Sequence, residues 1–344
     1  MGWLEDLGNA VSDAVDTVAG VVEAVVETAG DGVTDIVETV GNAAQDVLQS
    51  YGGPVGAWLG GVVNGVTNLA GAVIKGVFGI VAGVVGGVIR MVGAMLCLDG
   101  KLFGKGLFEI LSSIIGAVLY IGATLLSLLQ KIFFLQNNER TLTKAEKHLL
   151  RSVFVNSISL YNIRIVEGWS GAYGSGQYAT TIGNTIYLRD IVISSARDNN
   201  VLVHECVHIW QYQNVGSRYT AEALAAQLLQ PVGYNWEVAE ILRGNTVWLD
   251  FNREAQASFM QDVWLVGTLT FNGATRVGEG SFFDLQEVQG SFAAGSAAFI
   301  YTGATDSHDP TPSNSTVPVD YTDLATKSVA SMRARINIRW SRAF

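Results

Sequence analysis

The sequence has few cysteines, few charged residues and no basic residue in its first 51 positions, and each scarcity excludes a class of protein. Its 344 residues include 2 cysteines, Cys97 and Cys206, which are too few for the disulfide framework of a small secreted scaffold. Charged residues make up 15% of the chain and the net charge is −10. No region is basic enough to form a nucleic-acid footprint, so we expect no nucleic-acid partner.

The N-terminus also lacks the pattern of a Sec-type signal peptide. Met1 is followed by Gly-Trp-Leu-Glu-Asp, whereas a signal peptide has a cationic start and then an apolar core. We therefore expect the protein to be made in the cytoplasm without a Sec signal. If it leaves the cell, another export machine is expected to carry it.

Composition divides the chain into two unequal parts. Residues 1–140 are dominated by Gly, Ala, Val, Leu and Ile, whereas residues 141–344 carry most of the Trp, Tyr, Arg, Asn and Gln. The polar run Gln136–Arg140 separates the two parts. This length is sufficient for each part to bury a core of its own. We predict an all-α apolar N-terminal region followed by an α+β C-terminal domain over residues 141–344.

The first 50 residues predict an acidic amphipathic helical segment. Apolar residues recur at helical spacing, and Asp and Glu occupy the positions between them. Glycines at 20, 30, 32 and 41 weaken this pattern, since an interior Gly costs about 1 kcal/mol relative to Ala. We expect this helix to form against a partner, a channel wall or a membrane.

Residues 51–135 predict a helical membrane-inserting region. Between Tyr51 and Leu98 the only charged residues are Lys75 and Arg90. A second apolar run extends from Ile110 to Gln130. About 20 such residues are enough to cross a bilayer core. We favour a helical hairpin of about Pro54–Leu98 and Phe108–Phe134 with membrane contact over residues 51–134. A buried core that converts to a membrane form on delivery, and a Gly-rich domain that packs on itself, remain alternatives.

The C-terminal part predicts a mixed domain with a small sheet. Thr143 and Glu146 have the spacing of a capping box, which begins a helix. Strands are predicted at Ile163–Glu167 and Asn184–Arg189, with a loop at Gly168–Thr181 between them. Residues 199–213 predict a buried helix.

That buried helix contains the motif His204-Glu205-Cys206-Val207-His208. Two histidines at i and i+4 lie on one helix face, so both imidazoles can reach one metal ion. Zn²⁺ suits such a site because it accepts imidazole and tolerates three protein ligands plus water. Glu205 is then the expected catalytic acid and base, and His204 and His208 the expected metal ligands. Cys206 is expected to be a small buried residue.

A zinc hydrolase of this type needs a third protein ligand, and we predict Glu254. It begins the helical stretch EAQASFMQDVW, whose small residues allow a close approach to the motif helix. Glu222 is the second choice, although it lies close to His208 in sequence. The remaining candidates are Glu237, Glu240, Asp250 and Asp262.

Two further predictions concern the substrate cleft. Asn184–Arg189 is expected to be the edge strand against which a peptide substrate aligns. Tyr234 and Trp236 either line the cleft, where one could donate to an oxyanion, or pack in the core as aromatics more often do.

The stretch VLVHECVHIWQYQNVG resembles a family of bacterial zincin-like metallopeptidase domains with the pattern HELxHxWQYQ. These domains are similar to peptidase-like domains found with extracellular contractile injection systems and other toxin-delivery loci. The resemblance extends over about Leu142–Asp262 and includes GNTIYL, EALAAQ and REAQASFMQD in the same order. It implies that His204, His208 and Glu254 hold Zn²⁺ and that Glu205 is catalytic. Cys206 replaces the usual Leu.

These observations support two functional hypotheses. The first is a zinc metallopeptidase delivered as a toxin or effector by a bacterial injection apparatus, whose tube or chaperone would bind the N-terminal region. Its substrate would be a protein or peptide. The second is a membrane-perturbing or structural protein whose metal site only stabilises the fold. A hydrolase anchored in the membrane of its own cell is a variant of the first.

Overall fold

The protein is described here by a computed structural model. It describes residues 19, 26, 30–50, 53–97, 99–133, 135–136, 138–168, 179–188, 196–229, 233–271, 273–283, 287–288, 291–292, 296–302 and 318–334. The chain forms two compact units. Unit 1 comprises residues 1–139, 169–175 and 212–222, and unit 2 comprises residues 140–168, 176–211 and 223–344. Most of the predicted acidic segment lies outside the described residues.

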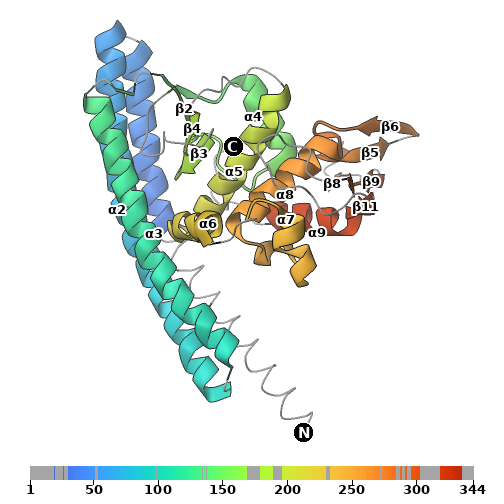
Figure 1. Ribbon diagram of the computed structural model, residues 1–344. Coiled ribbons are helices and arrows are strands. Elements are labelled where there is room, and N and C mark those ends of the chain that lie inside the picture. Colours follow the sequence, from blue (N-terminus) through green and yellow to red (C-terminus); the bar gives the residue numbers. More distant parts are fainter. Residues whose placement is uncertain are drawn as a thin grey trace. The chain divides into compact units, whose positions relative to one another are not determined.

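Unit 1 is built around a long helical hairpin, as the apolar runs predict (Figure 1). Helix α2 is Gly53–Cys97 and helix α3 is Gly100–Ile132. Both are long and apolar enough to cross a membrane by length and composition. Residues 30–50 are also helical and pack along α2.

Helix α3 begins earlier than the sequence predicts. The polar stretch Asp99–Lys105 was expected to lie outside the second helix, which was placed at Phe108. Instead Asp99 is the N-cap, and its side chain accepts hydrogen bonds from the backbone N–H groups of Lys101 and Leu102. Such a cap satisfies donors that a helix leaves unpaired at its start, which allows the polar residues to join the helix.

Glycines allow the two hairpin helices to touch closely. A Cβ atom at Gly87 would lie 2.5 Å from the carbonyl oxygen of Gly106, so no larger residue fits between the backbones at this level. The turn after helix α5 (Ala196–Val215) approaches α3 just as closely. A Cβ atom at Gly116 would lie 2.5 Å from the carbonyl oxygen of Ser217. Residues 212–222 therefore belong to the core of unit 1.

Unit 2 contains a four-stranded sheet in the order β1-β2-β4-β3. Its strands are β1 (Glu139–Thr141), β2 (Arg164–Glu167), β3 (Ala179–Ile182) and β4 (Thr185–Leu188). Strand β4 pairs parallel with β2 and antiparallel with β3. Gly183 is the first residue of the two-residue β3–β4 turn and has φ +61°, a conformation that glycine adopts at no steric cost.

Two predictions about this sheet are wrong. Asn184–Arg189 was expected to be the edge strand, but β4 occupies that region and is paired on both sides. Ala179–Thr181 was expected to belong to a loop, but it lies in β3, which is an edge strand of the sheet that the described residues form. The physical reason is the tight turn at Gly183, which folds the β-branched residues before it back onto β4. The rest of the predicted loop, residues 169–178, lies outside the described residues.

The helices of unit 2 surround the centre of its core. They are α4 (Lys144–Phe154), α7 (Trp236–Ala239), α8 (Arg253–Val266), α9 (Thr322–Ala334) and most of α5; α6 (Arg218–Leu229) passes from unit 1 into unit 2. The predicted capping box of α4 is present. Short 3₁₀ turns occupy Ile241–Arg243, Trp248–Asp250 and Ser281–Phe283. Aliphatic residues of the sheet and α5 pack with Trp210, Trp236 and Trp248 in one core.

The C-terminal part of unit 2 adds small antiparallel sheets. Strands β5 (Thr268–Phe271), β6 (Ala274–Val277) and β9 (Ser296–Ala298) form a sheet in the order β6-β5-β9. Two further pairs join β7 (Glu287–Val288) to β8 (Ser291–Phe292) and β10 (Ile300–Tyr301) to β11 (Val319–Asp320). The β5–β6 pair forms an antiparallel hairpin. The protein is thus mostly helical with small sheets, as predicted.

Candidate metal centre

Helix α5 presents two histidines on one face in unit 2. His204 and His208 are one helical turn apart, and the centroids of their rings are 5.1 Å apart. Both lie in the part of the helix that is surrounded by the core, because neighbouring positions such as Val203, Val207 and Ile209 are fully buried. The helix therefore holds both imidazoles in a dry setting.

Glu254 approaches these histidines from the first turn of α8. The Nε2 atoms of His204 and His208 lie 3.6 Å and 3.4 Å from Oε2 of Glu254. Ligand atoms about 2.05 Å from a tetrahedral metal ion are separated by about 3.4 Å, so these distances leave room for a metal ion of that size. The three residues form a group that can hold a metal ion. The structure thus brings together the three residues predicted as ligands.

Two glutamines orient the histidine rings. Nδ1 of His208 lies 2.8 Å from Oε1 of Gln211, and Nδ1 of His204 lies 2.8 Å from Oε1 of Gln261. The amide of Gln211 is itself fixed, because its Nε2 donates to the carbonyl oxygen of Arg253 and to Oε1 of Gln256. An amide oxygen only accepts, so each Nδ1 must carry the proton that it donates. In the neutral rings each Nε2 is left with its lone pair.

A third glutamine holds the carboxylate. Nε2 of Gln227, in α6, donates to Oε1 of Glu254 at 2.8 Å. Oε2 of Glu254 is then the oxygen that faces the two imidazole Nε2 atoms. Three lone pairs converge at this point, and they require a cation between them, which is either a proton or a metal ion. Three neutral amides thus support the three candidate ligands.

In the metal-free site, the closeness of the histidines and Glu254 shifts the pKa values of His208 and Glu254. Burial lowers the pKa of His208, but the charge of Glu254 outweighs this effect, and the pKa is raised to about 9. Burial raises the pKa of Glu254, but the charge of His208 and the hydrogen bonds from both histidines hold it well below its usual range. Without a metal, a proton on His208 therefore fulfils the role of the cation.

We predict that metal binding displaces this proton. Because the pKa of His208 is about 9 in the metal-free fold, zinc affinity should rise about tenfold per pH unit between about pH 6.5 and 8.5. Zinc competition titrations at several pH values measure this slope. Calorimetry in two buffers of different ionisation enthalpy should show release of about one proton. An affinity independent of pH in this window would contradict the prediction.

The stability of the metal-free fold should have the opposite pH dependence. A raised histidine pKa stabilises the fold fully below the unfolded value of about 6.5, and this contribution is lost as the pH rises to about 9. The lowered pKa of Glu254 stabilises the fold above about pH 4.5, and that contribution is lost in more acidic solution. Zinc should therefore raise Tm more at pH 8.5 than at pH 6.5.

Glu205 is buried next to His204 and is held by the edge strand. Oγ1 of Thr181, in β3, lies 2.7 Å from Oε2 of Glu205 and 3.2 Å from its backbone carbonyl oxygen. The hydroxyl has one proton and donates it to one of these oxygens at a time. Thr181 therefore fixes the position of the predicted catalytic carboxylate.

The other predicted residues divide between the site and the core. Cys206 is fully buried, as expected, and burial raises the pKa of its thiol well above the usual value. The ring of Tyr234 stacks on His204 with centroids 6.4 Å apart, whereas Trp236 is buried in the core and donates to Asp262. Of the two aromatics, only Tyr234 lies beside a candidate ligand.

Three of the remaining candidate carboxylates have partners other than the three ligands. Glu222 lies in unit 1, 3.6 Å from Nε of Arg218. Glu237 accepts from the hydroxyl of Tyr321. Glu240 accepts from Asn245 and from the side chain and backbone of Asn252, the N-cap of α8. Asp250 belongs to a 3₁₀ turn.

The glutamines are a part of the site that the sequence analysis missed, and they give a testable prediction. Replacing Gln211 by leucine removes the acceptor of the His208 Nδ1 proton, so zinc affinity should fall by about 10- to 100-fold. The control is Gln213→Leu, since residue 213 belongs to unit 1 and the three candidate ligands belong to unit 2. Competition with a fluorescent zinc chelator measures both variants. Equal affinities for the two variants would show that Gln211 does not orient the ligand.

No protein-family model matches this sequence, and no curated protein or solved structure matches the chain. A functional assignment therefore depends on the geometry of the site and on the resemblance of its motif.

Proposed function

We propose that this protein is a zinc-dependent metallopeptidase that cleaves a protein or peptide substrate. The observation that carries this proposal is the convergence of His204, His208 and Glu254 beside the buried Glu205. The three nitrogen and oxygen donors match the ligands that catalytic zinc accepts, and three protein ligands leave a fourth position for water or substrate. The resemblance of the motif to zincin-like peptidase domains supports the same class.

The chemistry assigns distinct roles to these residues. Zinc, when bound, polarises a carbonyl group and lowers the pKa of a coordinated water to about 7. Glu205 accepts a proton as the nucleophile forms and then donates it to the departing amine. Thr181 donates to Oε2 of Glu205, so we assign the proton transfer to Oε1. Gln211 and Gln261 keep the imidazole Nε2 atoms directed at the ion.

The substrate is proposed to bind as an extended strand. Among the described residues β3 is an edge strand of the four-stranded sheet, the kind of element on which extended peptides bind. Thr181 lies in this strand and contacts Glu205. A peptide aligned on β3 would therefore lie beside the catalytic carboxylate.

The N-terminal region is proposed to bring this peptidase to its target. The resemblance of the motif to domains of toxin-delivery loci supports an effector made in a bacterial cytoplasm and exported by an injection apparatus, with its tube or a chaperone as partner. Helices α2 and α3, both long and apolar, support contact with a membrane. A membrane-perturbing protein with a purely structural metal is the second candidate, which the exposed apolar residues of this hairpin favour.

Metal content and proteolysis test the proposal together. Full-length protein should bind about one zinc ion with His204, His208 and Glu254 intact, and it should cleave members of a proteome-derived peptide library. A chelator should abolish cleavage, and added zinc should restore it. Stoichiometric zinc with no cleavage of any library peptide would favour the structural role of the metal and overturn the peptidase assignment.

A further inference from the structure

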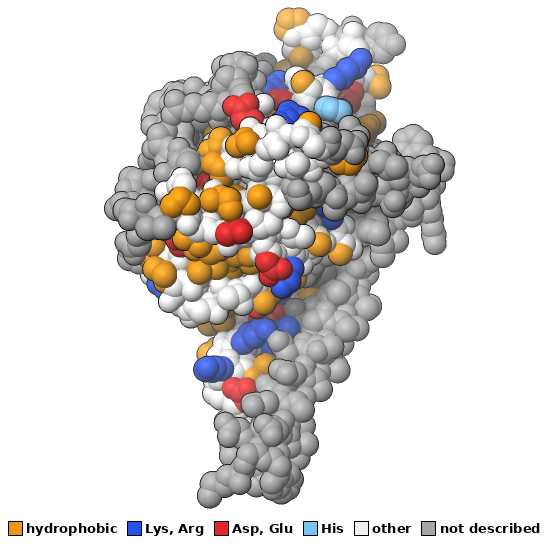
Figure 2. All heavy atoms as spheres, turned by 90° about the vertical axis from the view of Figure 1, so that its right-hand side faces the viewer, with side chains coloured by type: hydrophobic (Ala, Val, Ile, Leu, Met, Phe, Trp, Pro, Cys, Tyr) orange, Lys and Arg blue, Asp and Glu red, His pale blue; other side chains and the backbone are white. Residues whose placement is uncertain are grey.

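The hairpin of unit 1 has an exposed apolar face and a face with its buried charges, and the exposed lysines Lys101 and Lys105 lie at its turn end. On α2 the exposed large residues recur every three to seven positions from one end to the other, and all are apolar: Val55, Leu59, Val63, Val66, Val73, Val77, Val81, Val85, Val88, Val92 and Met95. On α3 such residues extend from Leu107 to Phe133. By contrast, acidic and basic side chains lie among the hydrophobic ones on the face of the molecule in Figure 2.

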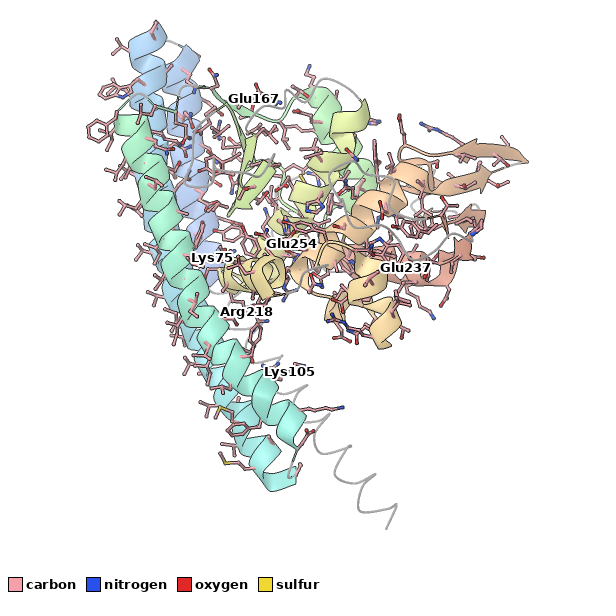
Figure 3. All side chains as sticks on the ribbon, in the orientation of Figure 1. Lys75, Lys105, Glu167, Arg218, Glu237 and Glu254 are labelled. Atoms are coloured by element: carbon pink, nitrogen blue, oxygen red, sulfur yellow. The ribbon has the colours of Figure 1, made fainter. Side chains whose placement is uncertain are left out.

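The buried charged residues of the hairpin are paired with partners in unit 1. Both charged residues of α2, Lys75 and Arg90, are buried. Lys75 lies 2.7 Å from Asp31 and stacks on the ring of Tyr212, and Arg90 pairs with Glu109. Figure 3 shows Lys75 on the side of the hairpin where Arg218 also lies.

The same side carries further polar contacts. Arg218 pairs with Glu109, and Tyr212 shares a hydrogen bond of 2.6 Å with Tyr120. Near the other end Nζ of Lys131 lies 2.7 Å from Glu139. Residues 30–50, 139 and 212–222 therefore neutralise one face of the hairpin, and the opposite face remains apolar.

The register of the hairpin places these cations at short intervals. Gly65 packs against Leu128 and Lys131, which marks the level of Lys131 on α2. Lys75 lies ten residues further along α2, about 15 Å away, and Arg90 another fifteen residues, about 22 Å. The hydrocarbon core of a bilayer is about 30 Å thick. Any slab of that thickness across the central part of the hairpin therefore contains a buried cation and its acidic partner.

The length of the apolar face gives a second argument against a spanning hairpin. Val55 and Met95 are forty residues apart, which is about 60 Å of helix and about twice the bilayer core. A hairpin that crossed the bilayer would leave about half of this face in water, at a free-energy cost proportional to its apolar area. A hairpin lying in the membrane plane buries the whole face and keeps the ion pairs intact.

We propose that the exposed apolar face of α2 and α3 binds a lipid bilayer flat, in the plane of the interface, without crossing it. This inference rests on the membrane contact in the proposed function and specifies its geometry. The occupant is a bilayer because the exposed large residues are all apolar from Val55 to Met95 and from Leu107 to Phe133 while the opposite face is ionic, which is the asymmetry of interfacial helices. The covering segments remain in place when the protein binds.

The native Cys97 provides the test of topology, since it is partly exposed at the end of α2 and Cys206 is fully buried. Full-length protein is mixed with vesicles of phosphatidylcholine containing about a quarter phosphatidylglycerol and recovered by flotation. The bound protein is then treated from outside with a membrane-impermeant maleimide. Flat binding predicts that Cys97 is labelled as fast as in detergent. Protection of Cys97 would show that the hairpin tip has crossed, which overturns flat binding but leaves membrane contact standing.

Two charge variants test the length of the bound face. Val66 and Val92 are about 39 Å apart, so a bilayer core about 30 Å thick cannot hold both sites of a spanning helix. Flat binding predicts that Val66→Glu and Val92→Glu each weaken partitioning by about tenfold. The control is Val277→Glu, an exposed valine of unit 2 that should have no effect. An effect of only one hairpin variant would overturn flat binding.

Two other outcomes would remove the membrane altogether. Failure of the monomeric wild-type protein to float with vesicles would refute both the membrane contact and its flat geometry. An oligomer that Val66→Glu and Val92→Glu dissociate, measured by light scattering without vesicle binding, would show that the face joins copies of the chain. Neither result bears on zinc content or peptide cleavage, so the peptidase proposal is judged separately.

Discussion

Replacement of Glu205 by glutamine is expected to lower kcat for peptide cleavage by on the order of 10³-fold while zinc content stays unchanged. Glutamine preserves the shape of the side chain and can still accept the Thr181 hydroxyl proton, but it cannot take up the proton released as the nucleophile forms. The measurement combines steady-state kinetics on the best library peptide with metal analysis of the same preparation.

The matched control for this variant is Glu237→Gln, another buried glutamate of unit 2. Its carboxylate accepts from the hydroxyl of Tyr321 and is not one of the three candidate ligands, so kcat should stay near the wild-type value. If Glu205→Gln retains full activity with zinc bound, Glu205 is not the proton carrier. If it loses zinc, the result is uninformative about catalysis and instead shows that Glu205 supports the metal.

Replacement of Glu254 by alanine is expected to weaken zinc binding by at least about 10²-fold and to abolish cleavage at limiting zinc. The binding free energy of a zinc ion with four ligands is about 12 kcal/mol, or about 3 kcal/mol for each ligand. A loss of about 3 kcal/mol lowers the affinity by about two powers of ten. The loss should be larger here because Glu254 is the only anion among the three candidate ligands. Chelator competition measures the affinity.

Glu222→Ala is the control that separates the two carboxylates favoured from the sequence. Glu222 pairs with Arg218 in unit 1, so its removal should leave zinc affinity unchanged. Loss of zinc from Glu222→Ala but not from Glu254→Ala would reverse the assignment of the third ligand. Thermal unfolding of both metal-free variants checks that each remains folded.

Local patterns predicted the elements of this protein that depend on neighbouring residues. The two apolar runs predicted the helical hairpin, and Thr143 with Glu146 predicted the capped start of α4. The spacing of His204 and His208 predicted two imidazoles on one helix face. Each of these features follows from helical periodicity or capping, which act over a few residues.

The site could be predicted only in part because its supports come from distant helices. Gln227 and Gln261 reach their partners across 27 and 57 residues of sequence, and no local rule pairs them. A weaker signal was present, since Gln211 is seven residues after His204 and Gln261 is seven residues after Glu254. That spacing places each glutamine on the same helix face as a candidate ligand.

The sequence analysis did not predict the edge strand β3, although the sequence contains the signal for the turn that follows it. Thr181-Ile182 and Thr185-Ile186 flank Gly183-Asn184, which is a two-residue hairpin signal between β-branched residues. The glycine-rich sequence before this turn favoured the prediction of a loop. Strand β4 pairs with β2, which lies well before it in the sequence, and no local signal predicts this contact. Because β4 is paired with β2 on one side, β3 on its other side lies at an edge of the sheet.

Helix α5 has a consequence for any attempt to dissect this protein. Its residues up to Gln211 belong to unit 2, while Tyr212–Glu222 belong to unit 1. A fragment that ends near residue 140 would lack the tyrosine that stacks on Lys75 and the arginine that pairs with Glu109. The apolar region is therefore not a cassette that can be excised, expressed alone or grafted onto another cargo, and gene fusions should retain the chain through Glu222.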